Sequence, residues 1–141
     1  MSRASINRLT VYMDGASRGN PGPAAIGVVI EDGGGEPRVK ISSYIGESTN
    51  NQAEYKALIM GLTEATALRA EHIDIKSDSE LLVEQVRGNY KVRNAGLRPL
   101  FEQVQQLLAG FKSFSITHIP RRKNSLADSL ANEALDIHLA H

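Results

Sequence analysis

The sequence contains no cysteine and no tryptophan, and it lacks any long apolar run. Without cysteine, the chain has no disulfide, no thiolate zinc site and no cysteine nucleophile. The first residues, MSRASINRLTVYMDG, lack the apolar core of a signal peptide, and no segment approaches the apolar length that spans a membrane. We therefore expect a cytoplasmic protein with no membrane partner.

A net charge is also absent, but the charges are unevenly distributed along the 141 residues. Residues 87–123 contain eight basic residues and one acid, so this segment carries +7 and the remainder carries −7. A basic segment of this kind is able to bind phosphates, although an unevenly charged solvated surface explains the same pattern. The apolar fraction of 41% suits a single domain over residues 1–141, with its core at about 9–136.

Hydrophobic periodicity predicts strands and helices in the order βββαβααβα. The expected strands are residues 9–14, 25–30, 38–45, 73–78 and 114–119. The expected helices are residues 49–68, 79–86, 97–108 and 125–139, with a linker at 88–96. Three strands in series indicate hairpins, and strands separated by helices indicate parallel crossovers. We therefore predict an α/β domain with a mixed five-stranded sheet flanked by helices.

Four acidic residues fall at the ends of these expected elements. Asp14 and Asp78 end two strands, whereas Glu54 and Asp128 lie in the first turns of two helices. If the two strands are neighbours, the aspartates lie within about 5–8 Å, because adjacent strands are about 4.8 Å apart. Each acid also has a structural explanation: a turn at Asp14, an N-cap at Asp78, and capping boxes that use Glu54 and Asp128.

The four acids taken together favour a cation site. Glu54 leads the apolar stripe of its helix, so its carboxylate should point toward the sheet. Buried carboxylates that lack a cationic partner repel one another and are costly to bury. Carboxylate oxygen suits Mg²⁺ or Mn²⁺, and two such ions are able to hold a phosphodiester between them.

Four segments together resemble the successive motifs of type 1 ribonuclease H: YMDGASRGNPGPAAIG, TNNQAEYKALIMGL, IKSDSELLVEQV and RRKNSLADSLANEA. They stand in the family's order and cover about residues 9–136. The resemblance implies the ribonuclease H-like fold. It also implies an endonuclease that hydrolyses the RNA strand of an RNA–DNA hybrid to 5′-phosphate and 3′-hydroxyl ends. Asp14, Glu54, Asp78 and Asp128 match the four carboxylates that bind two ions, Mg²⁺ or Mn²⁺, with Asp14 bridging both ions.

The resemblance implies substrate contacts as well. The positions that line the minor groove in the family are Ser17, Asn20, Asn50, Asn51 and Gln52, and those that hold a DNA-strand phosphate are Thr49 and Asn94. Amide groups both donate and accept hydrogen bonds, and the 2′-hydroxyl distinguishes RNA from DNA. Helix capping and turn formation are the alternative explanation for these residues.

The chain departs from part of the family in two places. Only residues 88–96 join the second and third helices, so the chain resembles the short form without a tryptophan-rich basic protrusion. Lys91, Arg93 and Arg98 substitute for that protrusion only in part, through their charge, and we expect weaker, more salt-sensitive hybrid binding. In many members a loop histidine assists product release, and Arg121 takes the comparable place in this chain. The resemblance leaves open whether Arg121 assists the leaving group or binds a phosphate. His118 is interpreted as structural.

Two other functions stay open at this stage. One is a nuclease of the same fold that acts on another substrate. The motifs argue against DNA junctions and single-strand ends as that substrate, but they leave double-stranded RNA open. The other is a nucleic-acid-binding module that has lost catalysis, although all four acids are present. We expect a monomer whose partner is an RNA–DNA hybrid.

Overall fold

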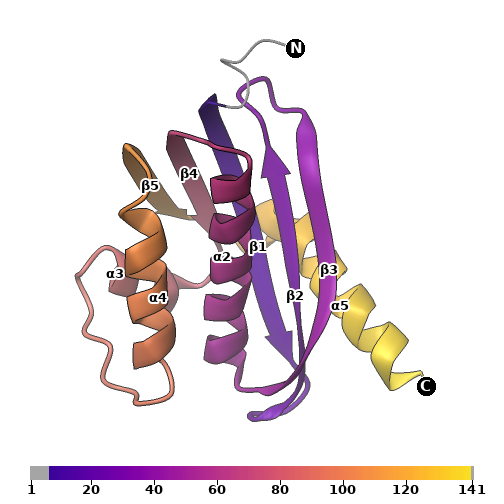
Figure 1. The fold of residues 1–141 in the computed structure, drawn as a ribbon. Coiled ribbons are helices and arrows are strands. Elements are labelled where there is room, and N and C mark those ends of the chain that lie inside the picture. Colours follow the sequence, from indigo (N-terminus) through magenta and orange to yellow (C-terminus); the bar gives the residue numbers. More distant parts are fainter. Residues whose placement is uncertain (1–6, 141) are drawn as a thin grey trace.

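Residues 7–140 are described by a computed structural model, and their fold is drawn in Figure 1. The strands are β1 (Arg8–Ser17), β2 (Gly22–Glu31), β3 (Pro37–Ser48), β4 (His72–Ser77) and β5 (Ser113–His118). They form one five-stranded sheet in the order β3-β2-β1-β4-β5. β1, β2 and β3 pair antiparallel, whereas β4 is parallel to both β1 and β5. The mixed five-stranded sheet predicted from the sequence is confirmed.

Helices cover both faces of this sheet. The α-helices are α2 (Asn50–Ala67), α3 (Glu80–Val86), α4 (Arg98–Leu108) and α5 (Ser125–Leu139), and a short 3-10 helix, η1 (Arg121–Asn124), precedes α5. α2 packs on β1 and β2 and also contacts α4, while α5 crosses the opposite face over β1, β2 and β3 (Figure 1). Within residues 7–140, no helix combines the length and apolarity that a membrane crossing requires.

Most of the core lies between the sheet and α2. Alternate β1 residues Leu9, Val11 and Met13 are fully buried there, as the period of two predicts. On the other face α5 lies directly against β2, because Gly27 has no side chain. A Cβ atom at Gly27 would stand 2.0 Å from the Ala127 carbonyl oxygen, closer than any real contact allows. The two helices that carry Glu54 and Asp128 are thus held close to the sheet on opposite faces.

The helix caps differ from those expected, and the differences matter for the site. Thr49 caps α2 and forms a capping box with Gln52, so Glu54 is not the capping acid. Ser79, rather than Asp78, caps α3 through a hydrogen bond to the Leu82 N–H. α5 has no side-chain cap bond at its start. The capping explanations offered for Glu54, Asp78 and Asp128 are therefore wrong, and their carboxylates are available for another role.

Candidate active site

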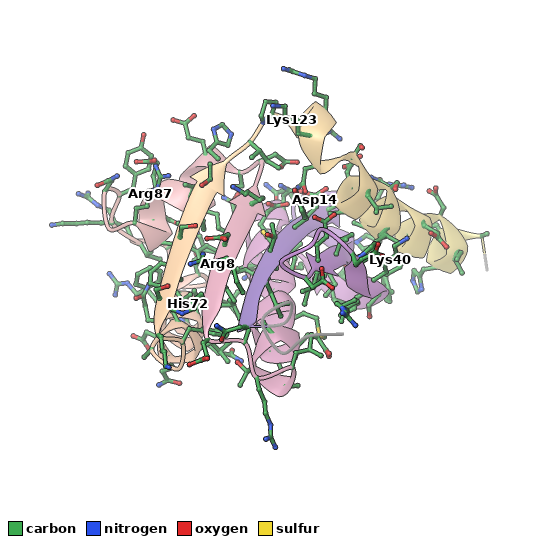
Figure 2. All side chains as sticks on the ribbon, turned by 90° about the horizontal axis from the view of Figure 1, so that it is seen from above. Arg8, Asp14, Lys40, His72, Arg87 and Lys123 are labelled. Carbon is green, nitrogen blue, oxygen red and sulfur yellow. The ribbon has the colours of Figure 1, made fainter. Side chains whose placement is uncertain are left out.

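Asp14 and Asp78 lie where β1 and β4 separate. The parallel pairing of these strands ends at Tyr12 and Lys76. Asp14 still pairs with Gly27 of β2, and Asp78 is the first residue after β4. Figure 2 shows Asp14 on β1 beside the start of α5. The sequence placed Asp14 at the end of its strand, whereas β1 continues to Ser17 as one arm of the hairpin with β2.

Glu54 comes to the same place from α2. It lies in the second turn of the helix, and its Oε1 atom accepts a hydrogen bond of 2.6 Å from the Gly15 backbone N–H. The approach is so close that a Cβ atom at Gly15 would lie 2.2 Å from the Ala53 carbonyl carbon. Glycine after Asp14 is therefore required for the packing of α2 on β1, which in turn places Glu54 beside Asp14.

The three carboxylates form one cluster. One ligand oxygen from each of Asp14, Glu54 and Asp78 lies within 4.8 Å of the others. They line an open cavity of about 470 Å³ whose wall is mostly polar. The rest of that wall consists of Gly15, Ala16, Ser17, Arg18, Asn50, Ser79, Arg121, Asp128 and Asn132. Four of the residues predicted from the sequence as substrate-binding or catalytic groups, besides this trio, thus lie around one cavity: Ser17, Asn50, Arg121 and Asp128.

The cluster is strongly acidic, and two of its three side chains are buried. Asp14 and Glu54 are 5% and 3% exposed. Burial and the neighbouring carboxylates raise the pKa of Asp14, and burial raises the pKa of Glu54, because charged forms are disfavoured there. Within residues 7–140, no lysine or arginine forms an ion pair with Asp14, Glu54 or Asp78. The cluster therefore has no basic side chain to neutralise the repulsion between its carboxylates.

Asp128 stands at the rim of the cavity rather than inside the three-member cluster. It is half-buried in the first turns of α5, and its Oδ1 atom lies 3.4 Å from Arg121 Nη2. Asn132, one turn later, donates to the Asp128 backbone oxygen at 2.9 Å and lies 3.3 Å from its carboxylate. The Arg121 side chain is 79% exposed, so its guanidinium faces solvent at the mouth of the cavity.

The β1–β2 turn and the start of α2 are joined by hydrogen bonds. Asn20 Oδ1 accepts from the Asn50 backbone N–H at 3.0 Å, and the Ser17 hydroxyl donates to the Ser48 carbonyl at 2.8 Å. Asn50 is exposed and lines the cavity, and Asn51 is exposed beside it. Three predicted substrate residues, Ser17, Asn20 and Asn50, are therefore brought to one edge of the site.

Thr49, Gln52 and Asn94 have structural partners of their own. The Thr49 hydroxyl accepts from the Gln52 N–H at 3.1 Å, and Gln52 Oε1 accepts from the Thr49 N–H at 3.0 Å. Asn94 Oδ1 accepts from the Gly96 N–H at 2.7 Å, and Gly96 lies against the Gln52 side chain. The capping and turn roles considered for Thr49 and Asn94 are thus present, and their contacts with a phosphate stay predictions.

Sequence reasoning missed Asn124, which it left in a basic loop. This loop is the 3-10 helix η1, and Asn124 at its end is buried with 1% exposure. Its amide nitrogen lies 3.0 Å from the Met13 carbonyl oxygen and 3.2 Å from Asp78 Oδ2. The available signal was its position directly before the expected helix, four residues ahead of Asp128, and this position does not by itself indicate burial.

Comparison with known proteins agrees with this geometry. The family model described as "Reverse transcriptase-like" matches residues 12–134. The chain is 36% identical over 143 residues to a ribonuclease H of Chromohalobacter salexigens, covering 92% of this chain and 85% of that protein. This chain belongs to the ribonuclease H family. The resemblance seen in its motifs is confirmed.

Further similarities place this ribonuclease H family member among solved structures. It is 46% identical over 129 residues to ribonuclease HI of Halobacterium salinarum. The crystal structure of that organism's RNase H1 matches with a TM-score of 0.89, covering 92% of this chain and 98% of that one. LC11-RNase H1 in complex with an RNA/DNA hybrid matches with a TM-score of 0.87 at 42% identity, covering 93% of this chain and 99% of that one.

Some curated relatives are longer than the region matched. The chain spans 65% of the Halobacterium protein and 36% of a bifunctional protein of Mycobacterium tuberculosis, to which it is 41% identical over 130 residues. What those whole proteins do beyond the shared domain therefore carries no weight for the site described above.

Proposed function

We propose that this ribonuclease H family member is a metal-dependent endonuclease that hydrolyses the RNA strand of RNA–DNA hybrids. The observation that carries the proposal is the cluster of Asp14, Glu54 and Asp78, whose oxygens lie within 4.8 Å without a cationic partner in the described chain. Its similarity to LC11-RNase H1, which was solved with an RNA/DNA hybrid, supports the choice of substrate.

The residues present fit a hard divalent cation. Glu54 Oε2 is buried and has no hydrogen-bond partner within residues 7–140, so this oxygen is available as a ligand. An all-carboxylate donor set favours Mg²⁺ or Mn²⁺ over softer metals. Two such ions, when bound, would neutralise the acids and stabilise the charge that develops on the phosphodiester oxygens.

The four acids would together hold these ions. Asp14, Glu54 and Asp78 would supply the ligand oxygens of the cluster, and Asp128 would supply one from the rim of the cavity. The reaction breaks the bond between phosphorus and the 3′-oxygen after attack by water. It therefore leaves a 5′-phosphate on one product and a 3′-hydroxyl on the other. Arg121 faces solvent at the mouth of the cavity, where its guanidinium is able to reach the leaving group or a neighbouring phosphate.

The substrate is recognised along the edge formed by the β1–β2 turn and the start of α2. Asn20 accepts a hydrogen bond there from the Asn50 backbone N–H, and Ser17 donates one to the Ser48 carbonyl. Asn51 and Gln52 follow on α2. We propose that these groups contact the minor groove and its 2′-hydroxyls. Thr49 and Asn94 lie near one another through Gln52 and Gly96, and we propose that they hold a phosphate of the DNA strand.

A cleavage assay on three substrates tests this function. End-labelled RNA–DNA hybrid, RNA duplex and DNA duplex would be incubated with Mg²⁺, with Mn²⁺ and with a chelator. We expect metal-dependent cuts in the RNA strand of the hybrid, and none in the DNA duplex. Hybrid cleavage that survives the chelator would contradict the metal mechanism. Equal cleavage of the RNA duplex would instead show a broader RNA specificity.

A matched pair of substitutions separates a catalyst from a binding module. Asp14→Asn removes a cluster acid, and Asp32→Asn removes another buried acid at the far end of β2. We expect Asp14→Asn to bind the hybrid without cleaving it, whereas Asp32→Asn keeps cleavage. A wild-type protein that binds the hybrid but never cuts it, with either ion, would favour a module without catalysis.

A further inference from the structure

The buried side chain of Asn124 fills the place where the sheet opens between β1 and β4. The pairing of these strands ends at Tyr12 and Lys76, so beyond that point the sheet no longer links Asp14 to Asp78. Asn124 Nδ2 lies 3.0 Å from the Met13 carbonyl oxygen and 3.2 Å from Asp78 Oδ2. The Asn124 side chain thus connects the end of β1 to Asp78 beyond the last backbone pairing of β1 with β4.

The identity of the amide atoms follows from their neighbours. The Met13 oxygen is a carbonyl and the Asp78 oxygen belongs to a carboxylate, so both are acceptors. The Asn124 atom between them must therefore be the NH₂ group, and both of its hydrogens are used. The amide oxygen of Asn124 is buried with no partner in the described chain. The residue is thus held in the interior by its donors alone.

These two hydrogen bonds tie together three of the elements that carry acids. The Met13 carbonyl is part of the peptide group that leads into Asp14. The bond to Asp78 engages the Oδ2 atom of its carboxylate. Asn124 itself is the residue before α5, four positions ahead of Asp128. A shift of Asn124 would therefore alter the positions of Asp14, Asp78 and Asp128 together.

We propose that Asn124 is a positioning residue that fixes the Asp78 carboxylate and the end of β1 in the arrangement that binds metal. The proposal rests on the proposed function, because it assumes that these acids hold divalent ions. Partners that hydrogen-bond a metal-binding carboxylate orient it, and their loss typically weakens metal binding or activity by about 10–100-fold. Asn124 touches neither substrate nor reacting atoms in this role.

The test compares Asn124→Ala with Gln85→Ala, a second buried amide. Gln85 is 4% exposed and accepts a hydrogen bond of 2.7 Å from the Tyr55 hydroxyl. Its amide nitrogen donates to the Lys91 carbonyl rather than to an acid of the cluster, and Gln85 does not line the cavity. Mn²⁺ binding to the protein without nucleic acid would be measured by calorimetry. The Mn²⁺ concentration for half-maximal cleavage, the KM for hybrid at saturating Mn²⁺ and the melting temperature would be measured beside it.

We expect Asn124→Ala to bind Mn²⁺ about tenfold or more weakly and to need correspondingly more Mn²⁺ for cleavage, with an unchanged KM for hybrid. Gln85→Ala should lower the melting temperature yet bind Mn²⁺ as the wild type does. Wild-type Mn²⁺ affinity in Asn124→Ala would overturn the proposal, as would an equal loss of affinity in both variants. If Asn124→Ala does not fold, Asn124→Ser, which keeps a shorter donor, is judged by the same measurements.

A double-mutant cycle tests whether Asn124 acts through Asp78. In an Asp78→Asn background the carboxylate to be oriented is gone and only the bond to the Met13 carbonyl remains to be lost, so adding Asn124→Ala should weaken Mn²⁺ binding less than it does in the wild type. Fully additive losses would overturn the assignment to Asp78. Measurements on the wild type distinguish a failure of the proposed function from a failure of the role proposed for Asn124. A wild type that neither binds Mn²⁺ nor cleaves the hybrid overturns both, whereas an active wild type with a normal Asn124→Ala overturns only this one.

Discussion

The Gly15 backbone N–H donates to the Glu54 carboxylate across 2.6 Å, which joins the strand that carries Asp14 to the helix that carries Glu54. The bond uses one oxygen of Glu54, and the other, Oε2, is buried without a hydrogen-bond partner in the part of the chain that the structure describes. Two acids that repel each other are therefore held in contact by main-chain packing. Since that packing depends on Gly15, the site requires a residue without a side chain at this position as well as the acids themselves.

Gly15→Ala should disturb both the fold and the site. A methyl group there would lie 2.2 Å from the Ala53 carbonyl carbon, so α2 must move away from β1. We expect a loss of about 1–3 kcal/mol in the free energy of unfolding, together with weakened cleavage. Urea denaturation measures the first effect. Gly110→Ala is the control, because its methyl group would make only an ordinary 3.4 Å contact. Equal stability of the two variants would refute this explanation.

Asp14→Asn should lower kcat by more than about a hundredfold, because even partners outside the metal's own ligands account for about 10–100-fold. Burial and the neighbouring carboxylates raise the pKa of Asp14, so in the metal-free protein folding must protonate a carboxyl group that is charged in the unfolded chain. An amide at this position avoids that cost, so the metal-free variant should be more stable. Thermal unfolding in a chelator measures that gain. Near-normal turnover in the variant would show that Asp14 is not a ligand.

Arg121→Ala should reduce kcat more than it raises KM for the hybrid. The guanidinium is 79% exposed and lies 3.4 Å from Asp128, so its loss leaves the fold unchanged but removes a cation from the cavity mouth. Steady-state kinetics at several salt concentrations separate the two effects. Arg122→Ala, the exposed neighbour, is the control. A higher KM with unchanged kcat would make Arg121 a phosphate anchor instead.

Replacing Asn50 and Asn51 with alanine should erode discrimination between RNA and DNA strands. Both side chains are exposed beside the cavity, and the bond between Asn20 and residue 50 uses the backbone N–H, so that bond survives the substitution. Cleavage of hybrids with single 2′-deoxy substitutions measures the change, with Asn89→Ala as a control, because the Asn89 side chain bonds Glu84 and does not line the cavity. An equal loss on every substrate would mean that the two asparagines have only a structural role.

Asp32 should stabilise the fold at neutral pH and cease to do so in acid. Burial alone raises the pKa of this carboxyl, but two backbone N–H groups of its own turn and the Arg38 guanidinium outweigh that effect and lower it. A depressed folded-state pKa gives stability above the unfolded value of about 3.9, and this stability is lost as the pH falls through the folded value. Asp32→Asn should therefore melt below the wild type at pH 7. The difference should shrink below about pH 4, and a constant difference would contradict the assignment.

Local sequence signals located most of the fold. The alternation of Leu9, Val11 and Met13 and the glycine-rich turns predicted the hairpins, because burial on one face imposes a period of two. The errors lie at the boundaries. Thr49, and not Asn51, caps α2, and Ser79 caps α3. Several neighbouring residues have side chains able to cap a helix, and only the entry path of the chain selects one of them.

The sequence by itself determined that the acids fall at the ends of elements, that no cysteine or tryptophan takes part, and that the motifs stand in family order. Only the tertiary structure decided which acids share a cluster, since strand order and the approach of α2 at Gly15 set distances between residues far apart in the chain. It also decided the place of Asn124. A buried amide between two acceptors is defined by the segments that surround it, and no local pattern in the chain specifies those segments.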